Sequence, residues 1–350
     1  MRVKAAVLRK MGLGPPYAAS RPLDIVELDV APPGRGEALV RIKAAGLCHS
    51  DLSVIDGSRP RPTPMALGHE IAGVVATAGE GVTHLAPGTR VAVNPSRPCG
   101  LCIHCREGMR NQCLDMRFMG SAMRNPHVQG GFRENVTVEA AQAIPIAKQL
   151  SLPEAAMAEP LAVCLHAANQ AGQLMGKRVL ITGCGPIGAL MVVVARCSGA
   201  AEIVVTDVAE ASLAVARKLG ASHAINVVTQ VAALDPWRAG KGSFDVLFEA
   251  SGNQAALRLA FDLLRPRATI VQLGLGGEMT LPVNSIVTKE LQLRGTFRFD
   301  AEFELALRLM GEGRLDVKPL ITASMPFDEA VEAFELASDR ASSMKVQLTF

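Results

Sequence analysis

Four cysteines lie close together in the sequence and could bind a metal ion. Cys99, Cys102, Cys105 and Cys113 have the spacing C-x2-C-x2-C-x7-C. Such spacing lets neighbouring thiolates turn toward one ion, and four thiolates close a tetrahedral zinc site without a position for substrate. The pattern therefore predicts a structural zinc that stabilises a loop with few apolar residues. An iron–sulfur cluster is the alternative, because its thiolates can have similar spacing. Since four cysteines fill the coordination shell, we expect His104 at the surface.

A glycine-rich loop that could bind a dinucleotide follows the strand-like RVLIT and precedes the apolar helical run ALMVVVARCSGA. Its pattern is G-x-G-x-x-G, formed by Gly183, Cys184, Gly185, Pro186, Ile187 and Gly188. The first glycine permits a tight turn, the second lets a pyrophosphate approach, and the third lets the helix pack against the strand. The helix N-terminus then offers free N–H groups to the phosphates. A strand-end turn that binds no ligand is the alternative.

Asp207 closes the next strand-like segment, AEIVVTD, nineteen residues after Gly188. A carboxylate at this place would accept hydrogen bonds from both ribose hydroxyls of an adenosine. It would repel a 2′-phosphate, and Val208 and Ala209 provide no arginine to compensate. The sequence therefore predicts NAD as the cofactor.

A second set of possible metal ligands is spread more widely along the chain. Cys48 stands in GLCHSD, His69 and Glu70 stand in GHE, and Glu159 stands in AEPLAV. One thiolate, one imidazole and one carboxylate leave a fourth position for water or a substrate oxygen, as in catalytic zinc sites. Spacing alone does not distinguish these residues from ordinary core or surface residues.

The elements around these motifs predict an α/β protein of two domains. Residues 1–152 contain short strands separated by Gly and Pro, which predicts a β-rich domain with the cysteine segment at about 95–115. Residues 153–294 alternate apolar strands with helical stretches, which predicts a doubly wound parallel sheet covered on both faces. Residues 295–350 are too few for a third domain, so we expect them to pack on one of the other two.

Composition argues against two classes of partner. The net charge of +3 is spread along the chain and forms no basic block that could follow a phosphate backbone. Aromatic residues make up 4%, too few to stack on bases. Apolar runs are interrupted before the roughly 18–20 residues that cross a bilayer. We therefore expect neither nucleic acid nor a membrane as a partner. The start, MRVKAAVLRK, is typical of a strand and not of an export signal, which predicts a cytoplasmic protein.

The stretch from Gly68 to Val82, GHEIAGVVATAGEGV, resembles the signature of the zinc-containing medium-chain alcohol dehydrogenases. The four cysteines, the glycine-rich loop and Asp207 follow in that family's order, and the resemblance covers essentially the whole chain. It implies a GroES-like catalytic domain, completed by the C-terminal tail, and an inserted Rossmann domain. It also implies two zinc ions per chain, NAD in the cleft between the domains, and a homo-oligomer, either a tetramer or a dimer.

Within that family the chain is similar to the polyol branch, most of all to its members that interconvert L-idonate and 5-keto-D-gluconate. Three segments carry this similarity, residues 94–132, 158–163 and 294–299. The resemblance implies that Cys48, His69 and either Glu159 or Glu70 bind a catalytic zinc, which acts as a Lewis acid on the substrate hydroxyl. It implies transfer of a hydride from a secondary alcohol of a sugar acid or polyol to NAD.

The resemblance also implies roles for the residues next to Cys48. Ser50 would be the first step of the proton relay, and Asp51 would orient the ring of His69. His49 would face the cofactor pyrophosphate. His166 lies on an apolar helix, where we expect a hydrogen-bonded core histidine and not a catalyst.

Phe118 and Arg298 match positions that line the substrate site in the polyol branch. A guanidinium there could bind the carboxylate of a sugar acid, and an exposed surface cation is the alternative. The segment CHSDLSV departs from the polyol pattern, because a histidine follows the zinc cysteine and Val54 replaces an aromatic residue, which would alter one wall of the substrate pocket. The alternative function is therefore a zinc alcohol dehydrogenase for simple or aromatic alcohols. A non-enzymatic NAD-sensing protein is disfavoured, since each ligand position holds a competent residue.

Overall fold

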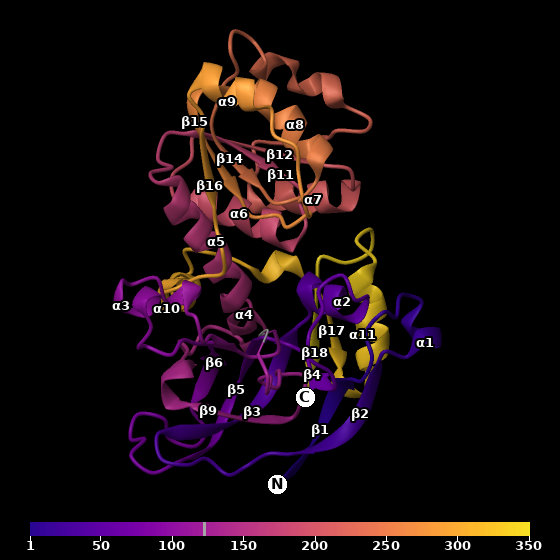
Figure 1. Cartoon of the computed structure of the whole chain (residues 1–350), viewed down its shortest axis with the longest axis vertical. Coiled ribbons are helices and arrows are strands. Elements are labelled where there is room, and N and C mark those ends of the chain that lie inside the picture. Colours follow the sequence, from indigo (N-terminus) through magenta and orange to yellow (C-terminus); the bar gives the residue numbers. More distant parts are fainter. Residues whose placement is uncertain (122–123) are drawn as a thin grey trace.

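A computed structural model describes residues 1–121 and 124–350 of the chain and shows two lobes (Figure 1). Residues 122 and 123, which fall inside the 94–132 segment, lie outside the described residues. One lobe holds strands from both ends of the chain, and the other holds the middle of the chain. The helices α4 (Leu152–Ala156) and α5 (Ala158–Ala171) lie where the two lobes meet.

The β-rich lobe is built on a sheet with the strand order β10-β6-β5-β3-β18-β17, and β9 also pairs with β3. Smaller sheets with the orders β2-β1-β4 and β7-β8 flank it. The strands of this lobe are β1 (Arg2–Leu8), β2 (Leu23–Asp29), β3 (Glu37–Gly46), β4 (Met65–Ala66), β5 (Glu70–Ala78), β6 (Arg90–Val93), β7 (Ser96–Arg97), β8 (Arg117–Phe118), β9 (Asn135–Glu139), β10 (Ala143–Pro145), β17 (Ile321–Pro326) and β18 (Lys345–Thr349).

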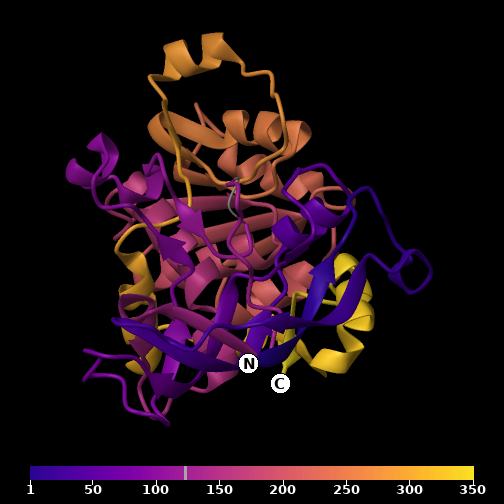
Figure 2. The same cartoon turned by 60° about the horizontal axis from the view of Figure 1, so that its bottom comes forward.

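The last strand of the chain lies beside one of the first. β18 pairs antiparallel with β3, and Gln347 is the register partner of Gly46. Figure 2 shows the two termini close together on this lobe. Residues that are distant in sequence therefore meet in one sheet, next to the segment that carries Cys48.

The second lobe contains a parallel sheet with the order β13-β12-β11-β14-β15-β16. Its strands are β11 (Arg178–Thr182), β12 (Glu202–Asp207), β13 (His223–Asn226), β14 (Phe244–Glu249), β15 (Leu264–Gln272) and β16 (Gln292–Gly295). Numbered within the lobe, this is the order 3-2-1-4-5-6 of a Rossmann fold. The predicted doubly wound sheet is confirmed. In this topology a dinucleotide binds at the carboxyl ends of the strands, where the strand order reverses beside β11.

Helices cover both faces of the parallel sheet (Figure 1). Besides α4 and α5, the helices are α1 (Tyr17–Ser20), α2 (His49–Ile55), α3 (Ile103–Arg106), α6 (Pro186–Cys197), α7 (Glu210–Leu219), α8 (Gln254–Leu263), α9 (Val283–Lys289), α10 (Glu302–Gly311) and α11 (Ala330–Ser338). Local sequence explains where they begin: Ser151 and Glu154 form a capping box at α4, and Asn253 caps α8. In the part of the chain that the structure describes, no helix combines the length and apolar character needed to cross a membrane.

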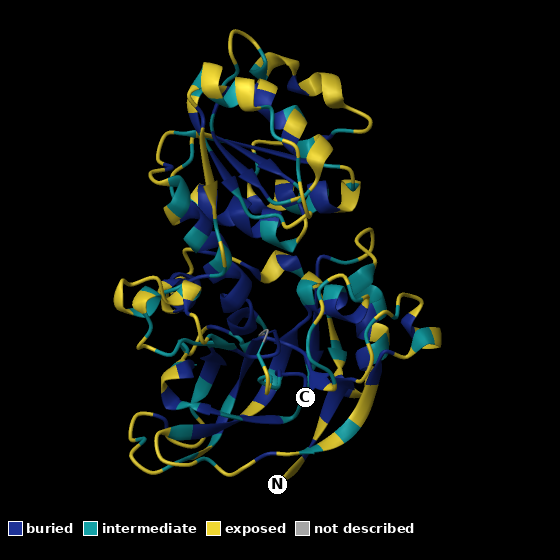
Figure 3. Cartoon of the chain, in the orientation of Figure 1, coloured by how far each residue is buried: buried dark blue, intermediate teal, exposed yellow. Residues whose placement is uncertain are grey.

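The largest hydrophobic core runs through both lobes. Ala44, Ala72 and Ala92, from three strands of the β-rich sheet, belong to the same buried cluster as α5, α6 and the strand β11. Small side chains on the sheet leave room for α4 and α5 to pack closely against it. Figure 3 shows that buried residues continue from one lobe into the other. Because the lobes share a core, residues from both can form one site.

Candidate active site

A thiol, an imidazole and a carboxylate meet at the end of the β-rich sheet that faces α5. Donor atoms of Cys48, His69 and Glu70 all lie within 4.8 Å of one another. Cys48 directly precedes α2, and Glu70 begins β5. The pairing of β3 with β5 sets Gly46 opposite Glu70, which brings the GLCHSD and GHE segments side by side.

Two glycines make this arrangement possible. A Cβ on Gly46 would overlap the carboxylate of Glu70. Gly68 has a φ of +95°, and a Cβ there would lie 2.7 Å from the ring of Phe132. Glycine tolerates both the close approach and the left-handed backbone. The glycines that precede Cys48 and His69 in the sequence therefore have a steric explanation.

Polar groups lie beside both ring nitrogens of His69. Its Nδ1 lies 3.5 Å from Oδ1 of Asp51, and its Nε2 lies 3.4 Å from Oγ of Ser50. The other oxygen of Asp51 accepts a hydrogen bond from the Cys48 N–H at 3.0 Å, so Asp51 also fixes the start of α2. Burial opposes a charge on His69, but the carboxylate of Asp51 outweighs it and raises the pKa of His69.

A buried lysine that the sequence patterns do not predict completes this group. Nζ of Lys345 donates hydrogen bonds to both oxygens of Glu70, at 2.7 and 2.9 Å, and to the Leu47 carbonyl at 3.0 Å. The lysine is 2% exposed and Glu70 is fully buried. Burial would lower the pKa of Lys345, yet Glu70 raises it, so the pair is ionic. No sequence motif signals this residue, because it reaches the site only through the β18–β3 pairing.

Glu159 lies on α5 at the same site but outside the gathered donor set. Among the described residues, the atoms within 4.8 Å of one another come from Cys48, His69 and Glu70. Glu159 is 6% exposed, and its burial, with the charge of Glu70, raises its pKa to about 7. A thiolate, an imidazole and a carboxylate at these separations fit zinc, whose bonds to such atoms are about 2.0–2.3 Å long.

The four-cysteine segment forms a compact sulfur cluster. The Sγ atoms of Cys99, Cys102, Cys105 and Cys113 all lie within 4.8 Å of one another. The separation between Cys99 and Cys105 is 4.0 Å, close to the roughly 3.8 Å expected for thiolates in a tetrahedral zinc site with bonds of about 2.3 Å. Backbone N–H groups near Cys102 lower the pKa of its thiol to about 6, which favours the ligating thiolate. The segment therefore fits a zinc ion. His104 was expected at the surface but is half-buried.

The glycine-rich loop has the geometry of a phosphate cradle. Gly183 has a φ of +82°, and a Cβ there would lie 2.7 Å from Ser251. Added at Gly188, a Cβ would collide with the carbonyl of Gly183, so the third glycine permits the close approach of α6 to β11. A Cβ on Gly185 would meet no described atom within 4 Å. That open side, with Pro186 and Ile187 in the first turn of α6, fits the predicted approach of a pyrophosphate.

Asp207 sits at the end of β12 beside this loop. One oxygen accepts the Cys184 N–H at 2.5 Å, and the other accepts the N–H groups of Val208 and Ala209 at 2.7 and 2.8 Å. The carboxylate is thus held where a ribose would lie. Burial raises the pKa of the Cys184 thiol to about 12, so it is less sensitive to oxidation than its place in the loop suggests. Cys197, at the end of α6, is partly exposed.

His49, the residue after Cys48, points away from the metal ligands. Its Nε2 lies 3.1 Å from a guanidinium nitrogen of Arg340. Partial desolvation and the charge of Arg340 lower the pKa of His49. Val54, expected in the wall of the substrate pocket, is instead 1% exposed and belongs to the core of the β-rich lobe. It lies on the face of α2 that packs inward.

Arg298 is half-buried and is not an exposed surface cation. Its Cζ lies 4.1 Å above the ring of Phe118, and that ring lies 5.8 Å from the ring of His69. Burial lowers the pKa of Arg298 to about 10. The two residues predicted to line the substrate site thus stack beside a predicted metal ligand.

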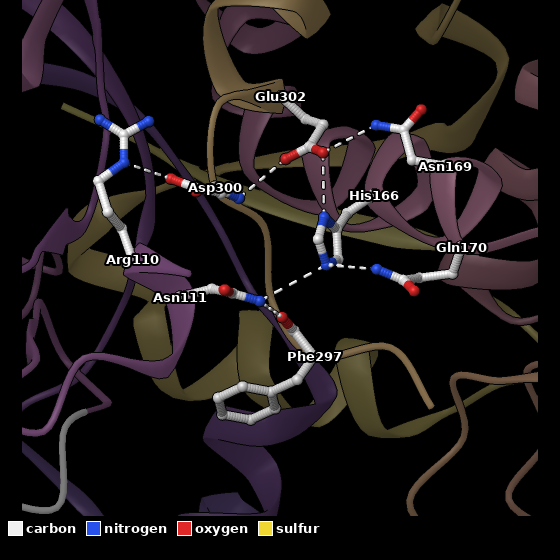
Figure 4. A network of polar contacts seen from close by, with 8 residues as sticks. All are labelled: Arg110, Asn111, His166, Asn169, Gln170, Phe297, Asp300 and Glu302. Carbon is white, nitrogen blue, oxygen red and sulfur yellow. Dashed lines mark hydrogen bonds and ion pairs between the residues drawn. The ribbon is translucent and has the colours of Figure 1, made fainter. Parts of the chain in front are cut away.

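A network of polar contacts connects the cysteine segment to the loop that carries Arg298 (Figure 4). Asn111 donates a hydrogen bond to the Phe297 carbonyl at 2.9 Å, and Arg110 pairs with Asp300 at 2.6 Å. On the other side, His166 lies 3.0 Å from Glu302, as expected for a hydrogen-bonded core histidine. The network is completed by Asn169 and Gln170 of α5. The loop is therefore held on both sides of Arg298.

Together, the Rossmann sheet with its phosphate cradle and the adjacent open donor set define a metal-dependent dehydrogenase that uses a dinucleotide. Comparison with known proteins agrees. Residues 34–148 match the family model described as "Alcohol dehydrogenase GroES-like domain", and residues 186–312 match "Zinc-binding dehydrogenase".

Curated relatives cover most of the chain. The chain is 44% identical to L-idonate 5-dehydrogenase (NAD(P)(+)) of Escherichia coli (strain K12) over 317 residues, 89% of this chain and 91% of the relative. It is 34% identical to sorbitol dehydrogenase of Gallus gallus, over 90% of each chain. The crystal structure of L-idonate 5-dehydrogenase from Escherichia coli K-12 MG1655 superposes with a TM-score of 0.92 at 39% identity, covering 100% of this chain and 99% of the other.

The chain belongs to the zinc-containing medium-chain alcohol and polyol dehydrogenases. It is an α/β oxidoreductase with a GroES-like lobe and a Rossmann lobe, and zinc and a nicotinamide dinucleotide are the cofactors of its family. The family expected from the sequence is thus confirmed.

Proposed function

We propose that this enzyme oxidises the C5 hydroxyl of L-idonate to the ketone of 5-keto-D-gluconate and reduces NAD to NADH. The observation that carries the proposal is the position of Arg298, a cation stacked on Phe118 beside the Cys48–His69–Glu70 donor set. The relative from Escherichia coli, 44% identical, is named for the same substrate.

Cys48, His69 and Glu70 would hold the catalytic zinc. Their donor atoms are already gathered, and the lone pairs of Glu70 that Lys345 leaves free can reach a metal. When bound, zinc supplies a Lewis acid that favours ionisation of the substrate hydroxyl. Glu159 would lie beside the substrate as a hydrogen-bonding group. Cys99, Cys102, Cys105 and Cys113 would hold a second zinc, closed to substrate.

The chain's own residues orient the reaction and remove the proton. Asp51 fixes the ring of His69, which leaves Nε2 directed toward Ser50 and the donor set. Ser50 is half-buried at the edge of the site, so its hydroxyl can pass the substrate's proton toward solvent. His49 and the glycine-rich loop would hold the cofactor phosphates while Asp207 holds the ribose. The hydride then passes from C5 to C4 of the nicotinamide, and NADH and one proton are released.

A dehydrogenase for simple or aromatic alcohols is the second candidate. The CHSD segment favours it, because His49 follows the zinc cysteine. Val54 gives this candidate little support, because its side chain is buried in the core of the β-rich lobe and not in a substrate pocket. A half-buried Arg298 disfavours a small apolar substrate, because desolvating a guanidinium without a partner is unfavourable.

A substrate panel with NAD tests the choice. We expect kcat/KM for L-idonate to exceed that for sorbitol, and both to exceed that for benzyl alcohol. Turnover of benzyl alcohol without turnover of L-idonate would contradict the substrate and leave the enzyme class intact.

The remaining assignments concern the chain as a whole. We propose boundaries near residues 152 and 294, since residues 295–350 contribute β17 and β18 to the first sheet. We propose a homo-oligomer, either a tetramer or a dimer, because β16 lies at the edge of the parallel sheet with exposed residues that could pair with a second copy. The free thiols of its cysteines suit a reducing compartment such as the cytoplasm.

A further inference from the structure

Two arginines that neither the motifs nor the comparisons assign lie next to the proposed substrate site. Arg59 and Arg61 belong to the loop between α2 and β4, and both are half-buried. The loop is folded back onto α2, because the Arg59 N–H donates a hydrogen bond to the Ser53 carbonyl at 2.8 Å. The helix that begins at the zinc ligand Cys48 therefore also carries this basic loop.

Arg61 is tied to the segment that carries Phe118. Its Nε donates a hydrogen bond to the Ser121 carbonyl at 2.9 Å, and its Nη1 donates to the Pro60 carbonyl at 2.7 Å. The Ser121 N–H in turn contacts the Phe118 carbonyl at 3.4 Å. These bonds fix the direction of the guanidinium, and within residues 1–121 and 124–350 its Nη2 makes no hydrogen bond.

Arg298 reaches the same place from the loop that follows β16. It stacks on the ring of Phe118, and its backbone has a φ of +52°, an unfavourable conformation for a residue with a Cβ. The contacts of Phe297 and Asp300 with the cysteine segment hold the loop on both sides of Arg298. Strain maintained by its surroundings in this way is typical of functional sites.

The three guanidinium groups share this region without a carboxylate partner. Among residues 1–121 and 124–350, no ion pair forms with Arg59, Arg61 or Arg298. Besides burial, the charges of Arg59 and Arg61 lower the pKa of Arg298, and the carboxylate of Glu159 opposes them in part. Arg59 adds to the burial that lowers the pKa of Arg61. The three cations therefore repel one another until an anion neutralises them.

We propose that Arg59 and Arg61 complete, together with Arg298, a binding site for the terminal carboxylate of the substrate. This rests on the proposed function and extends it. The reacting hydroxyl would lie at the Cys48–His69–Glu70 donor set, and the far end of the sugar acid would reach across Phe118 to the arginines. A guanidinium matches a carboxylate with two parallel hydrogen bonds, and the excess of positive charge speeds the arrival of an anion. Arg59 and Arg61 thus determine specificity and do not take part in hydride transfer.

The test uses Arg59→Gln, Arg61→Gln and the double variant, with Arg35→Gln as a control at an exposed arginine. We expect each single change to lower kcat/KM for L-idonate about tenfold and the double change about a hundredfold, chiefly through KM. The loss for sorbitol, which has no carboxylate, should be at least tenfold smaller. Arg35→Gln should leave both substrates unaffected. Equal losses for the two substrates, or no loss for L-idonate, would overturn the proposal.

A second measurement separates this proposal from the identity of the substrate. D-Gluconate should inhibit sorbitol oxidation by competing for the site, and its inhibition constant should rise about tenfold in each single variant. If the unaltered enzyme oxidises sorbitol but not L-idonate, the proposed substrate is wrong and gluconate inhibition still tests the arginines. Unchanged inhibition in the double variant would show that the arginines bind no carboxylate. If sorbitol 6-phosphate competes more strongly than gluconate, the arginines bind a phosphate ester, and the proposal of a carboxylate site is wrong.

Discussion

The ammonium group of Lys345 contacts both carboxylate oxygens of Glu70, and both side chains are buried. The two residues are 275 positions apart and meet because β18 lies beside β3. An ionised carboxylate has about four lone-pair sites, so two bonds from Lys345 leave room for a metal ion. The pair therefore holds Glu70 in place as a ligand while it offsets part of the negative charge.

Glu70 and Glu159 should differ in their effect on the catalytic zinc. We expect Glu70→Gln to lower the zinc content of the purified enzyme from two ions per chain toward one, because a ligand is lost and Lys345 loses its partner. Glu159→Gln should keep both ions and lower kcat at least tenfold. Metal analysis of the two variants gives the answer. Loss of zinc from Glu159→Gln with retention in Glu70→Gln would reverse the ligand assignment.

The two zinc sites should differ in lability. Cys99→Ser should lower the melting temperature by several degrees, because a closed structural site contributes directly to folding. Cys48→Ser should abolish turnover and change the melting temperature much less. A mild chelator should likewise remove one zinc together with the activity, while the circular dichroism spectrum is retained. A single, tightly bound zinc in a fully active enzyme would be incompatible with this assignment.

Asp207 should control the choice of cofactor. Asp207→Ser removes two ribose hydrogen bonds and the repulsion of a 2′-phosphate together, so the ratio of kcat/KM for NAD to that for NADP should fall about 10- to 100-fold. Steady-state kinetics with both cofactors measure that ratio. The related enzyme from Escherichia coli is named for NAD(P)+. The ratio of kcat/KM for NAD to that for NADP in the unaltered enzyme therefore tests the preference for NAD directly. Equal use of the two cofactors by the unaltered enzyme would remove the basis of this prediction.

Glu302 should make stability depend on pH. Burial alone would raise its pKa, but hydrogen bonds from His166 and its neighbours outweigh burial and hold the pKa at about 2, below the usual 4.5. Because the folded pKa is depressed, this stabilisation is complete above about pH 4.5 and is lost as the pH falls toward 2. Glu302→Gln should therefore unfold at lower urea concentration at pH 7, and its deficit should shrink at pH 3.5. A deficit that is equal or larger at pH 3.5 would contradict the assignment.

Local motifs explain why much of the fold could be predicted from sequence. The glycine-rich loop, the four cysteines and the strand ending at Asp207 each depend on neighbouring residues, so their spacing alone indicates their geometry. Lys345 and Arg61 could not be predicted in this way. Each belongs to the site only through a strand pairing or a loop contact with a distant segment, and neither stands in a recognisable pattern. Val54 was misplaced for a related reason, because its position after Cys48 does not reveal which face of α2 packs inward.

The reaction proposed for this site moves a hydride from C5 of L-idonate to NAD. L-Idonate carrying deuterium at C5, incubated with the zinc-loaded enzyme and NAD, tests this transfer directly by mass spectrometry of the reduced cofactor. We expect singly deuterated NADH and 5-keto-D-gluconate in equal amounts, and neither product from the enzyme after its catalytic zinc is removed. Unlabelled NADH, or label transfer that persists without that zinc, would contradict it.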